Sequence, residues 1–258
     1  MRLMKRILSA AAVLALSASL LVGCSSGTAS SVPVSASSAA ESTVSSVEET
    51  ASSAVDENEA AAAQLLNDLT GSYQELWPVI LADEYKQTWL DDCTALVGEE
   101  NAEAAFEKLS SMVTSDVYGE DAVKAYANGG GAYFCGFTNS LATLTFDGET
   151  STISGTDKDG NVLFSHTYHY IGMEPVHGLY EFESDDADSG EFTYFFLAPD
   201  TSAETYHIEF RYGSDAEALS QYDAGEYAYW VASGISTDCD QTMIDNCIEL
   251  FCTENLAG

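Results

Sequence analysis

The chain has 258 residues, and its 42 Asp and Glu against 8 Lys and Arg give a formal net charge of −34 at pH 7. Binding nucleic acid requires Lys and Arg to neutralise phosphates, so this composition excludes nucleic acid as a partner. An acidic surface attracts cations diffusely and repels anionic lipid surfaces, and it also favours solubility.

The first 24 residues have the pattern of a lipoprotein signal. Basic residues within 1–6 precede an apolar stretch over 7–20, and the sequence Leu-Val-Gly-Cys then ends at Cys24. The apolar stretch is short for a bilayer and is interrupted by serines, which argues against a membrane-spanning helix. Removal of a signal peptide over 1–23 would leave Cys24 as the acylated N-terminus. This pattern predicts an extracytoplasmic protein that is anchored to the cell membrane through its lipid alone.

A serine-rich stretch without aromatic residues, Leu or Ile follows over 25–55, and such a composition cannot build a core. We expect residues 24–57 to be the lipidated cysteine and a disordered tether, with an end-to-end distance of roughly 30 Å. The remaining residues, 58–258, suffice for one domain.

The domain begins with a pattern that is mainly helical over 58–127. Its clearest amphipathic stretch has apolar residues at i, i+3 and i+4 spacing. The members of this stripe are Ala102, Ala105, Phe106, Leu109 and Met112.

Short strands rich in β-branched and aromatic residues follow at regular spacing over 132–212. Asp-Gly pairs at 147–148 and 159–160 predict hairpin turns between them. The acidic stretch 184–191 is expected to be a solvated turn. Such a series of strands favours an antiparallel sheet that closes into a small barrel.

Two helices are predicted after the strands, over 216–219 and 241–251. The second has an apolar stripe of Met243, Cys247 and Leu250. The fold class is therefore mainly β with flanking helices, as an antiparallel barrel preceded by a helical N-terminal segment.

Five cysteines lie outside the lipobox: Cys93, Cys135, Cys239, Cys247 and Cys252. The number is odd, so at least one of them stays unpaired or pairs between chains. Cys247 and Cys252 are five residues apart on a predicted helix and point in different directions, which disfavours a bond between them. The pairings expected first are Cys239 with either of these two, or Cys93 with Cys135.

The segment 192–215 reads as two neighbouring strands joined by a loop. The aromatic run before Pro199 is one strand, and period-two alternation from Tyr206 is the other. Because residues i and i+2 of a strand share a face, His207 and Glu209 should point the same way. An imidazole and a carboxylate are two of the ligand types that zinc prefers. The same pattern also suits a solvated pair of polar side chains.

Three segments resemble the ZinT (YodA-like) family of extracytoplasmic zinc-binding proteins. They are the landmarks at 198–215, the stretch LTGSYQELWPVI at 69–80 and the stretch YAYWVASGIS at 227–236. Together the resemblance spans about residues 66–252. It implies a calycin-like or lipocalin-like barrel that binds zinc or a similar divalent cation, and an ABC-type metal transporter as the partner that receives the ion.

The resemblance also implies a divergent metal site. The family takes one His from the strand that ends in Ala-Pro and two from the next strand, and the corresponding positions here are Phe195, His207 and Glu209. A phenyl ring cannot bind zinc, so further ligands would have to come from elsewhere or from solvent. The recruits to expect are His169 and His177, although a histidine in an alternating strand usually faces water.

We find no catalytic motif in the sequence, which favours a binding protein over an enzyme. The first hypothesis is a lipid-anchored extracytoplasmic protein that captures zinc through His207 and Glu209. The alternative is a metal-free calycin-like module that binds a small organic ligand or a partner protein through Phe195, Tyr194 and Trp230.

Overall fold

A computed structural model describes residues 57–198 and 207–256 of the chain. Its centre is a closed barrel in which each strand pairs antiparallel with the next one and the last strand pairs with the first. The strands are β1 (Gly71–Glu75), β2 (Thr143–Asp147), β3 (Thr152–Thr156), β4 (Val162–Met173), β5 (Tyr180–Ser184), β6 (Tyr194–Leu197), β7 (Ile208–Gly213) and β8 (Ala232–Ser236). The predicted antiparallel barrel is confirmed.

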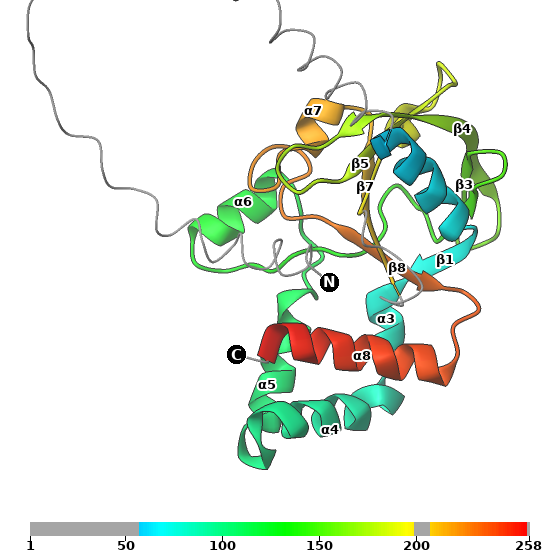
Figure 1. Ribbon diagram of the computed structural model, residues 1–258. Coiled ribbons are helices and arrows are strands. Elements are labelled where there is room, and N and C mark those ends of the chain that lie inside the picture. The colour runs from blue at the N-terminus through cyan, green and yellow to red at the C-terminus, as the bar shows by residue number, and fades with distance from the viewer. Residues whose placement is uncertain (1–56, 199–206, 257–258) are drawn as a thin grey trace, which may run out of the picture.

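The sequence pattern over 58–127 predicted a helical segment before the barrel. In the structure, β1 divides that segment. A helix over 57–68 comes first, but β1 follows it directly, and the next four helices are inserted between β1 and β2 (Figure 1). The labelled helices are α3 (Leu76–Ile80), α4 (Lys86–Val97), α5 (Glu99–Met112), α6 (Glu120–Ala127), α7 (Ala216–Leu219) and α8 (Gln241–Leu256). Two 3₁₀ turns, Asp83–Tyr85 and Gly190–Phe192, complete the regular structure. None of the helices in the described part has the length and apolarity needed to cross a bilayer.

Aromatic rings fill the inner face of the barrel. Alternate residues of successive strands point inward and pack against one another, and each of these rings is at most 4% exposed. They are Phe164, Tyr168, Phe182, Phe195, Phe210 and Tyr212. Three residues were expected to contact a small ligand or a partner protein. Phe195 and Trp230 are fully buried and serve as core, whereas Tyr194 is half-buried and its hydroxyl donates to Glu183.

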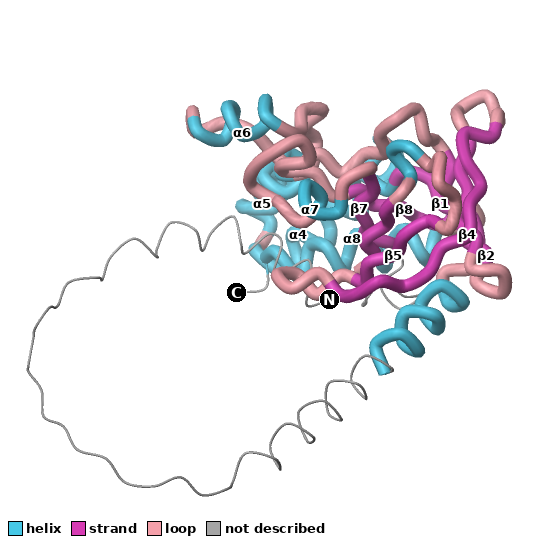
Figure 2. Tube along the Cα trace, turned by 90° about the horizontal axis from the view of Figure 1, so that it is seen from above, coloured by secondary structure: helices cyan, strands magenta, loops and turns pink. Residues whose placement is uncertain are grey.

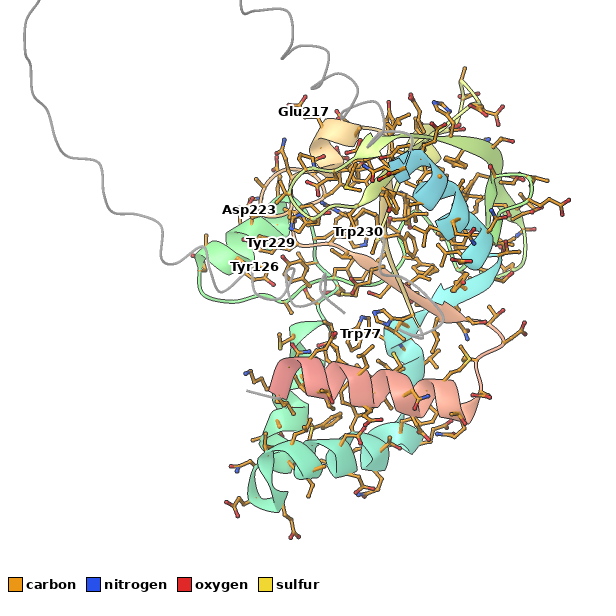
Figure 3. All side chains as sticks on the ribbon, in the orientation of Figure 1. Trp77, Tyr126, Glu217, Asp223, Tyr229 and Trp230 are labelled. Carbon is orange, nitrogen blue, oxygen red and sulfur yellow. The ribbon has the colours of Figure 1, made fainter. Side chains whose placement is uncertain are left out.

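The helices α4, α5 and α8 form a layer beneath the barrel (Figure 1). The ring of Phe251 makes edge contacts with Trp77 and Trp89, and the indole of Trp89 donates a 2.7 Å hydrogen bond to the carbonyl of Ile80. Figure 3 places Trp77 at the junction of this layer with the barrel. The aromatic cluster therefore couples the helical layer to the barrel wall.

The predicted stripe on α8 is only partly right. Cys247 is buried, but Met243 and Leu250 are half-buried. The residues that face the core are instead Ile244, Cys247, Ile248, Phe251 and Cys252. Because α8 packs against α3 as well as α4, its buried arc is wider than a single stripe and is rotated from the expected one.

Both Asp-Gly pairs form turns between consecutive strands, as predicted. Gly160 has a φ of +81°, which favours glycine. Gly148 has a different reason to be glycine: a Cβ there would lie 2.4 Å from the Cα of Asn67. The turn thus permits close approach of the 57–68 helix, which Figure 2 shows beside the β2 end of the barrel.

The five cysteines outside the lipobox are all free thiols. The structure brings the sulfur atoms of Cys93 and Cys252 to 3.9 Å from each other. The expected pairings of Cys93 with Cys135, and of Cys239 with Cys247 or Cys252, are wrong for this structure, because the packing of α4 on α8 was not visible in the sequence.

Candidate metal site

The strand β7 is buried on both of its faces, although alternation predicted only one buried face. Phe210 and Tyr212 face the barrel interior, where their rings contact Phe195. Glu209 and Arg211 therefore lie on the outer face. Other segments of the chain cover that face, including the stretch after β7 that places Leu219 and Tyr227 against Arg211, so its charged residues are removed from water.

His207 and Glu209 lie on the same side of the chain, as their spacing predicts. The His207 Nε2 atom is 3.9 Å from the Glu209 Oε1 atom, and the side chains are 9% and 10% exposed. Burying a histidine and a carboxylate is costly unless both are paired, so this arrangement is more than a solvated surface pair.

A small cavity adjoins His207 between the barrel and the helices. Its volume is about 10 Å³, roughly the space of one water molecule. Its walls come from α3 and α8, and its lining residues are Leu76, Trp77, Ile80, His207, Cys247, Leu250 and Phe251. The walls are apolar apart from His207 and the Cys247 thiol, so an ion here would be shielded from bulk water.

The Glu209 carboxylate lies close enough to two buried thiols to raise their pKa. Burial, together with the Glu209 carboxylate, raises the pKa of Cys247 to about 12 and that of Cys135 also to about 12. Both are therefore neutral thiols at pH 7. Sequence reasoning treated these cysteines only as disulfide partners and missed their place beside the His207 and Glu209 pair.

The structure places His169 on the outer surface of β4, away from this pair. Its Nδ1 atom lies 2.7 Å from Asp185, and both side chains are about half exposed. His166 makes a similar contact of 2.8 Å with Asp186. The acidic turn at 184–191 was expected only to be solvated, but it supplies carboxylate partners for these two histidines.

His177 is buried, but it belongs to another cluster. Its Nδ1 atom is 3.5 Å from Glu174, and its ring packs against Tyr222 with centroids 3.7 Å apart. Glu174 accepts hydrogen bonds from the backbone N–H groups of Val176 and His177. Burial raises the pKa of Glu174, but the interaction with the His177 side chain, together with these backbone hydrogen bonds, outweighs burial and leaves the pKa below its usual range.

Sequence reasoning missed a buried arginine next to this cluster. Arg211 follows Glu209 on the outer face of β7, and its guanidinium donates to the carbonyl oxygens of Leu219 and Tyr227. The available signal for a buried arginine was its position between apolar residues of a strand, in a chain that has 8 Lys and Arg in all. One partner is the last residue of α7 and the other lies in the loop that follows, and no local pattern predicts their position beside Arg211.

Phe195 does not occupy the space between His207 and Glu209. It pairs with Tyr212 across β6 and β7 and points into the barrel, where it is fully buried. Glu209 points out of the barrel. The phenyl ring at the expected ligand position therefore lies on the opposite side of the sheet from the Glu209 side chain.

The donor set fits a zinc ion in part. Bonds of about 2.0–2.2 Å at a tetrahedral angle would place two donors roughly 3.4 Å apart, so His207 and Glu209 would have to approach by about 0.5 Å. Within residues 57–198 and 207–256, no group of three or more His, Cys, Asp or Glu side chains is arranged to hold a metal ion. The described residues thus supply two donors of the correct chemical type.

No protein-family model matches the chain. No curated protein matches it either. Among solved structures, the zinc(II)-bound ZinT-like domain of AdcA from Streptococcus pneumoniae matches at a TM-score of 0.45 and 16% identity, covering 71% of this chain and 89% of that chain. Zinc(II)-bound AdcA from the same organism matches at a TM-score of 0.42 and 15% identity, covering 72% of this chain and 35% of that chain. With TM-scores below 0.5, neither similarity adds to the geometry of the site.

Proposed function

We propose that this protein binds a divalent cation, zinc first among them, through His207 and Glu209. The observation that carries the proposal is the approach of the His207 Nε2 and Glu209 Oε1 atoms to 3.9 Å in a place that is nine-tenths buried. Imidazole nitrogen and carboxylate oxygen are common zinc ligands. The role is binding without catalysis.

Comparison with the other histidines supports this choice. His169 also lies beside a carboxylate, but about half of each side chain in that pair is exposed to water. His177 is also buried beside a carboxylate, that of Glu174, but its ring packs against Tyr222. His207 and Glu209 are both about nine-tenths buried, and His207 also borders the small cavity between the barrel and the helices.

The proposed setting is the outer side of the cell membrane. The lipobox that ends at Cys24 would supply an acylated N-terminus, and the serine-rich stretch over 25–55 would act as a tether. Both segments lie outside the described residues. A cation-binding domain held there would pass its ion to an ABC-type metal transporter, as the sequence resemblance to the ZinT family implies.

Calorimetric titration of the metal-stripped protein with zinc tests the proposal. We expect saturable heat with one ion per chain. The variant His207→Ala should bind at least tenfold more weakly, because it removes one of the two donors. Glu209→Gln should also bind more weakly. His169→Ala is the matched control, since it removes an exposed histidine that also contacts a carboxylate.

Absence of saturable heat in the wild-type protein would remove the metal hypothesis. Equal heats for the wild type and His207→Ala would place the ion elsewhere. A loss of binding in His169→Ala as large as that in His207→Ala would show that zinc binding is not confined to the buried pair.

A cleft favours a second candidate function, which is the binding of a small organic ligand. Its volume is about 330 Å³, at the lower end of the range for ligand sites. Its walls include Trp77, Leu81 and Phe134, and the carboxylates of Glu75 and Asp116 also border it. Aromatic walls beside carboxylates suit a ligand that has an apolar body and a cationic end.

Titration with benzyltrimethylammonium tests this candidate through tryptophan fluorescence. Trp77 lines the cleft and the other two tryptophans, Trp89 and Trp230, do not, so a change would report mainly on Trp77. We expect a saturable change that weakens in Asp116→Asn. An unchanged spectrum up to millimolar ligand would exclude this class of ligand.

A further inference from the structure

Two buried thiols face each other inside the helical layer. The sulfur atoms of Cys93 and Cys252 are 3.9 Å apart, and both residues are fully buried. Cys93 lies on α4 and Cys252 on α8, two helices that pack against each other. The pair therefore joins segments that are 159 residues apart in the chain.

The other three cysteines in the described part have different surroundings. Cys135 lies beside Ser233 and Glu209 in the wall of the barrel, and Cys247 borders the cavity next to His207. Cys239 is partly exposed, in the turn before α8. The contact between Cys93 and Cys252 is therefore a distinct structural feature.

We infer that Cys93 and Cys252 form a disulfide bond when the protein folds in the presence of a disulfide oxidant. In the balanced reaction the two thiols and one oxidised glutathione molecule give the Cys93–Cys252 disulfide and two molecules of reduced glutathione. The two cysteine sulfurs lose two electrons and two protons, and the glutathione sulfurs gain them. Each exchange proceeds by attack of a thiolate on a disulfide sulfur.

The geometry favours this bond over the other pairings. A disulfide requires sulfur atoms about 2.05 Å apart, so these two must close by about 1.9 Å. Rotation of a cysteine side chain moves its sulfur by a distance of this order without moving the helix. The aromatic contacts of Trp89 and Phe251 already hold the two helices together.

Burial decides when the bond can form. It raises the pKa of Cys93 and of Cys252, so neither sulfur is ionised to a useful extent in the folded protein at neutral pH. Oxidation should therefore be fast during folding, when the thiols are accessible, and slow afterwards. Once formed, the bond should resist reductants for the same reason.

Peptide mapping of the full chain, refolded with and without oxidised glutathione, tests the inference. Cleavage after glutamate separates the cysteines: Cys93 falls in the peptide 85–99 and Cys252 in 250–254, whereas Cys239 and Cys247 share 227–249. We expect a linked 85–99 and 250–254 pair in the oxidised sample, which disappears after denaturation with reductant. The wild-type protein suffices, so no variant has to fold for the result to be read.

Thermal unfolding gives a second measurement. A bond that closes a loop of this length should raise the melting temperature by about 10 °C relative to the reduced protein. In Cys93→Ala and Cys252→Ala this difference should vanish, while in Cys239→Ala it should persist. Free Cys93 and Cys252 after oxidative refolding would overturn the inference, as would a dominant linkage of either one to another cysteine.

Discussion

The guanidinium carbon of Arg211 lies 4.1 Å from the centroid of the Tyr222 ring, and both side chains are buried on the outer side of the barrel. The guanidinium also donates to the carbonyl oxygens of Leu219 and Tyr227, which belong to the segment that crosses this part of the barrel after β7. A single buried cation thus ties that loop to the strand. Glu174 lies close enough to act as its counter-charge.

We therefore predict that Arg211→Met lowers the free energy of unfolding by about 2–4 kcal/mol. The substitution keeps an apolar side chain of similar length but leaves buried carbonyl oxygens without their donor. Urea unfolding at pH 7 measures the change. Lys158→Met is the matched control, because Lys158 is 83% exposed and pairs with Asp159 on the surface. A change below about 1 kcal/mol in Arg211→Met would contradict the role given to the guanidinium.

The pKa of Glu174 predicts a dependence of stability on pH. Hydrogen bonds from His177 and Val176 hold this pKa below its ordinary value of 4.5 despite the burial of the carboxyl. The folded state therefore binds fewer protons than the unfolded state in this range, and the contribution is complete above the unfolded pKa. It is lost as the pH falls through the folded pKa.

The difference in unfolding free energy between the wild type and Glu174→Gln isolates this effect from the other carboxylates. We expect a difference of about 1–2 kcal/mol at pH 6–7, which shrinks progressively below about pH 4.5. Chemical denaturation at a series of pH values measures it. A difference that stays constant from pH 7 to pH 3 would show that Glu174 is not ionised in the folded protein.

The features that could be predicted from sequence depend on a few neighbouring residues. The turns at 147–148 and 159–160 follow from Asp-Gly chemistry, and the convergence of His207 with Glu209 follows from the two-residue period of a strand. The short helix Ala216–Leu219 was predicted at its observed bounds, because the Asp215 side chain caps it locally.

The features that could not be predicted depend on contacts between distant segments. Both faces of β7 are buried because other parts of the chain cover its outer face, including the segment with Leu219 and Tyr227 over Arg211, and no pattern within the strand indicates this cover. The approach of Cys93 to Cys252 likewise requires the packing of α4 against α8. The helical pattern over 58–127 likewise did not show that most of these helices are inserted between β1 and β2.

Gly148 provides a test of the close approach between a hairpin turn and the first described helix. A Cβ on this residue would lie 2.4–2.6 Å from backbone atoms of Asn67 and Leu66, which cannot move without displacing the helix. We predict that Gly148→Ala lowers the unfolding free energy by about 1–3 kcal/mol. Thermal and urea unfolding measure the loss.

Gly130→Ala is the control for this substitution. The nearest atom to a Cβ at Gly130 is the Ala125 carbonyl oxygen at 3.6 Å, an ordinary contact, and the backbone there suits any residue. Its effect should stay within about 0.5 kcal/mol. Equal effects of the two substitutions would show that the turn tolerates a side chain and that the helix is not held against it.

Tyr229 combines an unfavourable backbone conformation with a favourable ring contact. Its φ is +57°, which lies in a region that residues other than glycine rarely adopt. Its ring stacks on Tyr126 with centroids 3.7 Å apart, and Figure 3 shows these two residues at the side of the molecule. The stack offsets a backbone cost of about 1–2 kcal/mol.

Two substitutions of Tyr229 separate the backbone cost from the contribution of the ring stack. Tyr229→Ala and Tyr229→Gly both delete the stack, but only glycine relieves the positive φ. We therefore predict that Tyr229→Gly is more stable than Tyr229→Ala by about 1 kcal/mol, the reverse of the usual order in which alanine is the more stable of the two. Urea unfolding of both variants measures the difference. A more stable alanine variant would show that the left-handed backbone conformation at position 229 is lost when the tyrosine ring is removed. The contact between the rings of Tyr229 and Tyr126, and not the surrounding backbone, would then determine that conformation.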